Sequence, residues 1–317
     1  MRKKVVVLGG GTGMSSLLKG LKEFPIDITA VVSVCDDGRS TGRLRSEFHI
    51  PAMGDIRQVL VSLSESGPLV EKLLNYRFNT TSDLNGHPVG NLLLTAMSNM
   101  TGNMSTGVKA LGKIFNLKGN ILPLTDDEVT LCAKMEDDTI VEGEHNITEC
   151  FAKIKEVFYK EKPKLNKEVE LAIKDADLVI LSMGSIYTSI IPNLLCKEVV
   201  DALEKTNIPI MYTCNIMTQP GETDDLSVSE HINIINKYLG NRRVDIVLAN
   251  SGKIDENLRK KYETLEQKDP VLIDKENLKD VKLISNDYVT IDNNYLRHDT
   301  ILLSLDIFKY LITNNKR

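Results

Sequence analysis

The chain has 317 residues, of which 42% are hydrophobic and 26% are charged, and its formal net charge is −5. This composition is that of a globular protein with a substantial core, and the acidic balance argues against a general affinity for nucleic acid. The five cysteines show no C-x-x-C spacing, which favours reduced thiols in a cytoplasmic protein over a disulfide framework or a zinc site.

Continuous runs of Val, Ile and Leu predict strands that are buried on both faces, as in a parallel sheet. They cover residues 4–8, 28–34, 177–182, 208–213 and 244–249. Amphipathic patterns between them predict helices at 13–23, 56–65, 90–100, 106–115, 166–175, 196–205, 227–239 and 300–313. The alternation predicts a single α/β domain over 1–317 with a Rossmann-type, doubly wound, mostly parallel sheet. No apolar run is long enough to predict a membrane span.

Two stretches depart from this alternation. Residues 117–159 contain short alternating segments at 120–124, 129–135, 139–142 and 154–158, which predict a small antiparallel β insertion. Residues 252–298 are polar, and we expect a helix at 256–267 and short strands at 271–273 and 281–285. The apolar helix at 90–100 suits either the core or the face of a homodimer.

A glycine-rich turn follows the first predicted strand. Residues Gly9-Gly10-Gly11-Thr12-Gly13 separate that strand from a helix start, which is where α/β proteins bind phosphate. The loop lacks the Gly-Lys-Ser/Thr ending of a P-loop, and a strict G-x-G-x-x-G fingerprint would need a third glycine at Met14. We therefore expect a nucleotide or sugar phosphate here, and a NAD-dependent dehydrogenase is disfavoured.

Adjacent acids and several arginines follow the second strand. Asp36 and Asp37 could bind Mg²⁺ beside a phosphate, and Arg43 and Arg45 could clamp that phosphate. The alternatives are a solvated loop or a basic patch for a regulatory partner protein. Asp55 is either a helix N-cap or a third metal ligand.

Two short motifs near helix starts add candidate ligand residues. Arg57 follows Asp55, and His87 and Asn91 flank the start of the helix at 90–100. For His87, binding of an anion or sugar and a plain loop role stay open.

Two later strands also end in polar turns. The first turn carries Gly184, Ser185, Tyr187, Thr188, Ser189 and Asn193, which suits a second phosphate or a diphosphate. The second carries Asn215, Thr218, Gln219, Glu222 and Thr223, whose amides, hydroxyls and acid could recognise a base or sugar. Ligands of open α/β sheets bind beyond the carboxyl ends of strands, so the segment from Asp36 to Arg45 should face the glycine loop. The base, diphosphate and sugar of a ligand would then spread across the strand ends.

Taken in order, these motifs resemble those of the bacterial YvcK-like gluconeogenesis factor family. The resemblance rests on Gly9–Gly13, Asp36-Asp37-Gly38, Gly42–Arg45, Gly54–Arg57, Gly86-His87, Gly90–Leu93, Tyr187–Leu195, Asn215–Thr223 and Arg297-His298-Asp299, and it spans essentially the whole chain. The family is related to CofD, the 2-phospho-lactate transferase, so the resemblance implies a CofD-like fold. This chain departs from the family at Arg39, Thr41 and Ser182-Met183.

The resemblance implies two functions for the same site. The first is a cytoplasmic factor that binds UDP-sugars such as UDP-N-acetylglucosamine and supports cell shape and cell-wall balance during gluconeogenic growth. Gly10, Gly11, Thr12 and Gly13 would then bind phosphate together with the polar residues named above. The alternative is a Mg²⁺-dependent phosphotransferase in which Asp36, Asp37 and Asp55 are the catalytic metal ligands.

Overall fold

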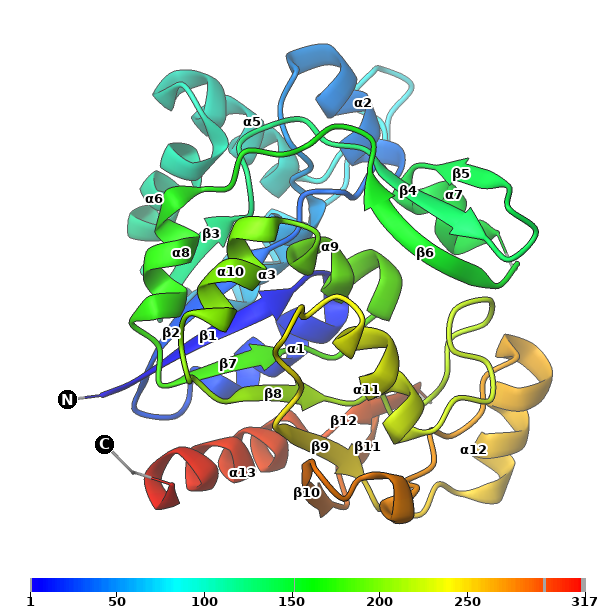
Figure 1. The fold of residues 1–317 in the computed structure, drawn as a ribbon. Helices are drawn as coiled ribbons and strands as arrows, with labels where there is room; N and C mark the ends of the chain where they lie inside the picture. The colour runs from blue at the N-terminus through cyan, green and yellow to red at the C-terminus, as the bar shows by residue number, and fades with distance from the viewer. Residues whose placement is uncertain (1, 151, 293–294, 315–317) are drawn as a thin grey trace.

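A computed structural model describes residues 2–150, 152–292 and 295–314, apart from the side chain of Arg39. In these ranges seven strands form one parallel sheet in the order β10-β9-β8-β7-β1-β2-β3 (Figure 1). The strands are β1 (Lys3–Gly9), β2 (Ile26–Val32), β3 (Asn120–Pro123), β7 (Leu178–Leu181), β8 (Ile210–Thr213), β9 (Ile246–Asn250) and β10 (Lys282–Asn286). All of the predicted parallel strands are present.

The strand order reverses between β1 and β7. The chain starts in the middle of the sheet, proceeds through β2 to the edge at β3, and returns to add β7, β8, β9 and β10 on the other side of β1. Connections on the two sides of such a reversal leave the sheet in opposite directions, which opens a crevice at the carboxyl ends of the two strands. The topology therefore places the candidate site between β1 and β7.

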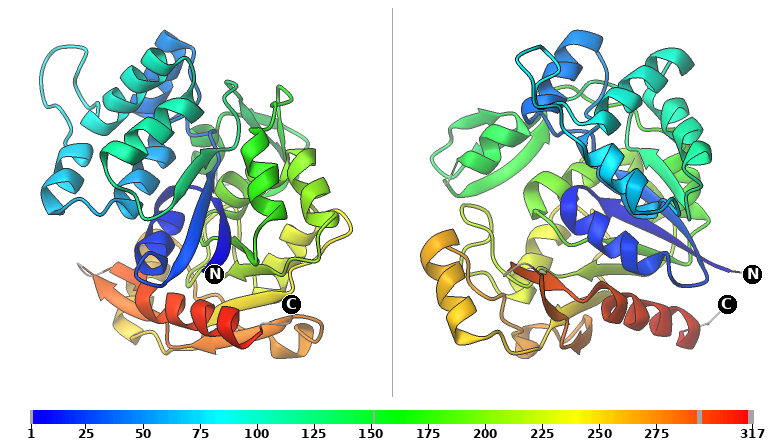
Figure 2. Two further views of the ribbon diagram at one scale, coloured as in Figure 1. Left: turned by 90° about the vertical axis from the view of Figure 1, so that its left-hand side faces the viewer. Right: turned by 180° about the vertical axis from the view of Figure 1, so that it is seen from behind.

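Helices cover both faces of the sheet, which confirms the predicted doubly wound α/β fold (Figure 2). One face carries α1 (Gly11–Leu21), α3 (Gly54–Leu63) and α13 (Thr300–Thr313), and the other carries α8 (Lys167–Lys174), α10 (Lys197–Glu204) and α11 (Val228–Asn236). Leu17, Leu18 and Leu21 of α1 are buried in the core. No helix in the described ranges is long and apolar enough to cross a membrane.

In the described chain, the connection between β2 and β3 holds five helices. They are α2 (Arg39–Phe48), α4 (Pro68–Asn75), α5 (Val89–Thr101) and α6 (Met104–Ile114), in addition to α3. The sequence predicted α3, α5 and α6 but neither α2 nor α4. Helix α2 is polar and buries Leu44 while Phe48 stays partly exposed, so it has no clear apolar stripe.

The insertion before β7 is a three-stranded antiparallel sheet with one short helix. It consists of β4 (Leu131–Met135), β5 (Ile140–Glu142), α7 (Glu144–Glu149) and β6 (Ile154–Tyr159), in the sheet order β5-β4-β6. The assignment of 120–124 to this insertion was wrong, because β3 pairs parallel with β2 and closes one edge of the large sheet. A strand of only four residues has too short a hydrophobic pattern to show whether it pairs parallel or antiparallel with its neighbour.

The polar region near the C-terminus differs from the prediction in two places. Helix α12 (Glu256–Lys261) continues into a π-helical turn, Tyr262–Glu266, and β10 confirms the later strand. Residues 271–273 do not form the predicted strand, because Val271 reaches the core from an irregular segment. A hairpin of β11 (Val289–Asp292) and β12 (Tyr295–His298) was not predicted.

Candidate ligand cleft at the switch point of the sheet

Gly10 and Gly13 of the glycine loop pack against their neighbours too closely for a side chain. A Cβ atom on Gly13 would lie 2.1 Å from the backbone oxygen of Met183, and one on Gly10 would lie 2.4 Å from Oδ2 of Asp55. Gly11 also has a φ of +64°, which disfavours other residues. These glycines therefore bring the start of α1, whose first N–H groups have no partner within the helix, against the loop that follows β7.

A cleft of about 670 Å³ opens beside the glycine loop, between α1 and the turns after β7 and β8. Several predicted ligand residues line it together: Thr12, Gly13, Gly184, Ser185, Asn215, Thr218 and Gln219. A volume of this order is typical of a site for a small organic ligand. The turns after β7 and β8 thus meet the glycine loop at the carboxyl edge of the sheet.

Side chains from the turn after β8 fix the turn after β7. The amide of Asn215 accepts a hydrogen bond from the N–H of Gly184 at 2.9 Å and donates to its carbonyl at 2.8 Å. Glu222 accepts the hydroxyl of Ser185 at 2.5 Å and the amide of Gln219 at 2.6 Å. Asn215 and Ser185 thus serve both as lining residues and as supports of the cleft wall.

Residues after Ser185 form a π-helix, Ile186–Ile190, that leads into α9 (Ile191–Leu194). Ser185 caps it by accepting the N–H of Thr188 at 2.9 Å. Ser189 faces the glycine loop, whereas Tyr187 and Thr188 are buried below the surface of this turn. π-helical turns often occur at functional sites, and the sequence predicted only a polar turn here.

Three predicted ligand residues are buried and support the cleft from behind. Asn193 donates to the carbonyls of Gly9 at 3.3 Å and of Ser189 at 2.9 Å. Thr223 accepts the N–H of Gln219 at 2.9 Å. Burial raises the pKa of Glu222 to about 7, although Ser185 and the backbone of Tyr187 donate to its carboxylate.

Carboxylates gather on the other side of the glycine loop, toward β2. Asp55 accepts a hydrogen bond from the N–H of Gly11, and its pKa is raised to about 7 by burial and by the negative charges of Asp36 and Glu144. Asp36 accepts the N–H of Gly38 at 2.9 Å and the hydroxyl of Thr41 at 3.0 Å. Glu144 comes from α7 and was not predicted.

The positions of these carboxylates bear on the prediction that Asp36, Asp37 and Asp55 bind Mg²⁺. Among the described residues, no group of three His, Cys, Asp or Glu side chains lies close enough to hold a metal ion. Mg²⁺ usually binds through one or two carboxylates together with waters and a substrate phosphate. The mutually repelling carboxylates of Asp36 and Asp55 fit that pattern, and the role of both residues stays a prediction.

Asp37 lies at the insertion rather than beside Asp55. Its Oδ1 accepts the N–H of His145 at 2.8 Å at the start of α7, and a Cβ on Gly143 would lie 2.4 Å from its Oδ2. Thr148 of α7 lines the cleft. Asp37 therefore holds one wall of the cleft in place, a role that the sequence did not indicate.

The predicted ligand residues Arg57, His87 and Asn91 belong to a buried polar network outside the cleft. The guanidinium Nε of Arg57 donates to Asn91 Oδ1 at 3.1 Å. The amide of Asn91 donates to Ser40 Oγ at 3.3 Å, and that oxygen lies 2.8 Å from Nδ1 of His87. This network joins α2, α3 and α5, and it accounts for these residues without a ligand.

Arg43 and Arg45 of α2 also point away from the cleft. Arg45 is buried and donates to the carbonyl of Val129 at 2.7 Å, which anchors the insertion. Arg43 is exposed and donates to the carbonyl of Asp83 at 2.8 Å. The side chain of Arg39 lies outside the described residues.

The far end of the cleft consists of residues that the sequence did not single out as ligand residues. The lining here includes Tyr262 and Lys268 from the segment after α12, and Tyr295, Arg297 and His298 from β12. Of these, only Arg297-His298 belonged to a motif recognised in the sequence. Neither tyrosine was predicted to line a site. Tyr262 lies within the predicted helix at 256–267, whose pattern does not indicate a cleft, and Tyr295 lies in a hairpin that was not predicted.

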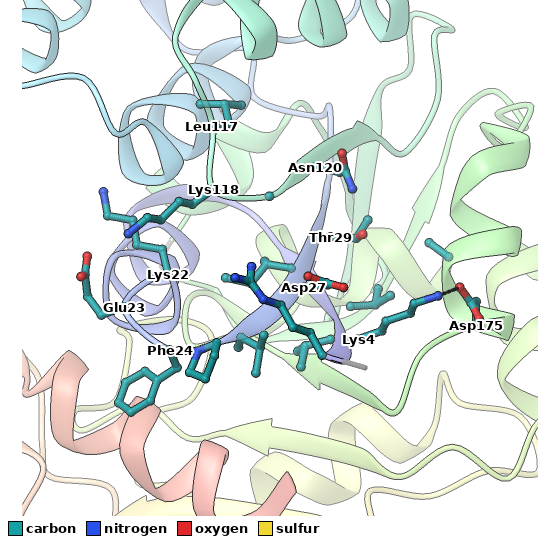
Figure 3. A pocket seen from close by; sticks show the side chains of 18 of the residues that line it. Lys4, Lys22, Glu23, Phe24, Asp27, Thr29, Leu117, Lys118, Asn120 and Asp175 are labelled. Atoms are coloured by element: carbon teal, nitrogen blue, oxygen red, sulfur yellow. Dashed lines mark hydrogen bonds and ion pairs between the residues drawn. The ribbon is translucent and has the colours of Figure 1, made fainter. Parts of the chain in front are cut away.

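A larger cavity, of about 900 Å³, lies at the opposite edge of the sheet (Figure 3). It is lined by the amino ends of β1 and β2, and several of the charged side chains in its lining form ion pairs with one another. Lys4 pairs with Asp175, and Lys118 lies 3.3 Å from Glu65. No glycine turn or helix start of the kind seen at the switch point faces it, so the cleft remains the better candidate.

The comparisons with known proteins agree with this architecture. Residues 5–289 match the family model described as 2-phospho-L-lactate transferase CofD. The chain belongs to the CofD family. The gluconeogenesis factor of Bacillus subtilis (strain 168) is 44% identical to this CofD-family chain over 303 residues, covering 94% of this chain and 95% of the relative.

A further relative and two solved structures are also similar to this CofD-family chain over nearly its whole length. The gluconeogenesis factor of Halalkalibacterium halodurans is 43% identical over 307 residues, covering 96% of this chain and 95% of the relative. A crystal structure of a Bacillus halodurans protein superimposes with a TM-score of 0.94 at 42% identity, covering 97% of this chain and all of the other. A second Bacillus halodurans structure, described as a member of the UPF0052 family, has a TM-score of 0.93.

Proposed function

We propose that this protein binds a nucleoside-diphosphate sugar, such as UDP-N-acetylglucosamine, in the cleft at the switch point. The observation that carries the proposal is the meeting of the α1 start at Thr12-Gly13 with the Gly184-Ser185 turn across one cleft. Backbone N–H groups and the helix dipole favour a phosphate at the α1 start. Amides, hydroxyls and two tyrosines along the remaining wall suit a base and a sugar.

Binding of this kind would serve a regulatory role rather than a metabolic conversion. Support comes from the relatives, which are named gluconeogenesis factors and not after a reaction. In this proposal the protein acts in the cytoplasm, where the level of the sugar nucleotide reports on carbon supply, cell-wall synthesis and cell shape. A protein partner would read out the occupied state.

A second candidate function is a Mg²⁺-dependent phosphotransferase. The observation that favours it is the pair of repelling carboxylates, Asp36 and Asp55, beside the glycine loop of a chain in the CofD family. If Mg²⁺ binds, these two residues would hold it, and the ion would supply charge neutralisation at a transferred phosphoryl group.

Calorimetric titration separates the two candidates. UDP-N-acetylglucosamine, UDP-glucose, GDP and NAD are each titrated with and without Mg²⁺, and the ligand is then recovered and analysed. Saturable binding of UDP-sugars with intact recovery supports the regulatory factor. Preference for GDP or NAD would contradict it, and Mg²⁺-dependent consumption of a nucleotide that Asp36→Asn abolishes would favour the transferase.

A further inference from the structure

A serine–glutamate pair, of which the glutamate is buried, supports the cleft wall after β7. Ser185 lines the cleft, and Glu222 lies behind it with 9% of its surface exposed. The Ser185 hydroxyl donates to Oε2 of Glu222 at 2.5 Å, and Gln219 donates to Oε1 at 2.6 Å. The backbone N–H of Tyr187 also donates to the carboxylate.

The direction of the Ser185 hydroxyl depends on the charge of Glu222. A serine hydroxyl has one hydrogen to donate, and an ionised carboxylate can only accept. While Glu222 is ionised, the Ser185 hydrogen points to it and away from the cleft. The Ser185 oxygen also accepts the N–H of Thr188 at 2.9 Å. Because its one hydrogen is donated to Glu222, the Ser185 hydroxyl has no hydrogen left to donate to a ligand phosphate.

We propose that ligand binding takes up one proton at Glu222 and thereby turns the Ser185 hydroxyl toward a phosphate oxygen of the ligand. The proton comes from solvent and adds to Oε2 of Glu222. The new carboxyl O–H donates to Ser185 Oγ, and the serine hydrogen rotates into the cleft. No bond between heavy atoms forms or breaks. Glu222 acts through Ser185 and is a positioning residue, and the inference rests on the proposed binding of a nucleoside-diphosphate sugar.

The surroundings of Glu222 make this protonation accessible near neutral pH. Burial raises its pKa to about 7, and the negative charge of Glu144 on α7 acts in the same direction. Tyr187 of the π-helix faces it with a phenol whose pKa is raised to about 12, so that group stays neutral. From the turn after β8, Gln219 contributes an uncharged amide.

Calorimetry with UDP-N-acetylglucosamine tests the proposal, because the diphosphate diester of this ligand does not change charge between pH 6 and 8. Titrations in buffers of different ionisation enthalpy count the protons taken up. At pH 8 we expect the binding of each ligand to take up nearly one proton. Above pH 7 the Kd should therefore increase with pH, by up to about tenfold per pH unit. Equal Kd values at pH 6 and pH 8, without proton uptake, would overturn the proposal.

Two variants separate this role from a merely structural one. In Glu222→Gln the amide donates permanently to Ser185, so its Kd should be independent of pH and at pH 8 no weaker than that of the wild type. Ser185→Ala should bind more weakly and take up no proton. Glu23→Gln removes an exposed acid at the opposite edge of the sheet and should retain the wild-type profile.

The outcomes also separate this inference from the proposed function. Weaker binding of Glu222→Gln at every pH would show a structural support and overturn the proton linkage. Absence of saturable binding by the wild type at any pH would instead contradict the proposed function itself.

Discussion

Residues around the cleft divide into those that face its interior and those that hold its walls. Thr12, Ser185 and Thr218 line the interior. Asn193 and Thr223 are buried behind the wall, where they pair with backbone groups. The same residue types appear in both groups, so a polar side chain after a strand does not by itself indicate contact with a ligand.

Gly13→Ala should strongly destabilise the protein. The added Cβ would lie 2.1 Å from the Met183 carbonyl oxygen, which is backbone and cannot rotate away. Overpacking of this kind typically costs about 1–3 kcal/mol. Urea denaturation measures the change in the free energy of unfolding. Gly67→Ala is the matched control, because nothing lies within 4 Å of its added Cβ; an equal loss in both variants would contradict the close packing of the glycine loop.

Asn215→Asp should weaken ligand binding with little change in shape. The amide donates to the Gly184 carbonyl and accepts its N–H, and a carboxylate can only accept. A lost donor facing a carbonyl costs about 1–2 kcal/mol, which corresponds to roughly a tenfold or larger rise in Kd. Calorimetry with UDP-N-acetylglucosamine measures it, and exposed Asn99→Asp is the control. Unchanged affinity would show that the Gly184 turn does not contact the ligand.

At the scale of elements, the small insertion completes the cleft. Helix α7 supplies Thr148 to the lining, and its start is bound by Asp37 from the turn after β2. Tyr159 at the end of β6 donates to the Pro192 carbonyl at 3.0 Å, and the Val157 N–H donates to the hydroxyl of Tyr238 at 3.1 Å. The insertion is therefore tied to the large sheet at both its helix and its last strand.

Asp37→Ala should loosen α7 while the large sheet stays intact. Loss of a carboxylate that accepts an N–H at a helix start costs about 1 kcal/mol. Hydrogen–deuterium exchange should accelerate in residues 144–149 and remain unchanged in β1 and β7. Glu149→Ala, at the other end of α7, is the control; if residues 144–149 exchange equally fast in both variants and in the wild type, Asp37 does not hold the helix.

The elements that the sequence predicted and those that it missed differ in how they bury apolar surface. Strands β1 and β7 are apolar on both faces, which is readable from four consecutive residues. Helix α2 and the hairpin β11–β12 bury few apolar side chains, so their hydrophobic pattern is weak. The glycine loop was predictable from its composition. The far end of the cleft was not, because Tyr295 comes from a hairpin that was not predicted, and the helical pattern at 256–267 does not show that Tyr262 packs against the cleft.

Over the whole molecule, buried histidines should limit stability in acid. Burial lowers the pKa values of His231 and His298 to about 4, below those of an unfolded chain. The unfolded state binds these protons first, so their contribution to stability is present above about pH 6.5 and is lost as the pH falls toward 4. His231 is fully buried, with Nδ1 3.1 Å from the Tyr212 hydroxyl.

His231→Gln should flatten this pH dependence. Between pH 6.5 and 4 the slope of the unfolding free energy should fall by at most about 1.4 kcal/mol per pH unit, which corresponds to one proton. Urea denaturation at successive pH values measures the slope, whatever the stability of the variant at pH 7. Exposed His49→Gln should keep the wild-type slope, and an unchanged slope in His231→Gln would refute the assignment.

Both ends of the described chain lie at the edge of the sheet opposite the cleft. Strand β1 begins there at Lys3, and the amide of Asn314 lies 3.4 Å from Nζ of Lys282, the first residue of β10. The cleft opens at the carboxyl ends of the same strands. A reporter protein fused to either end, or a sensor chip that holds the molecule by one end, would thus leave the ligand entrance open to solvent.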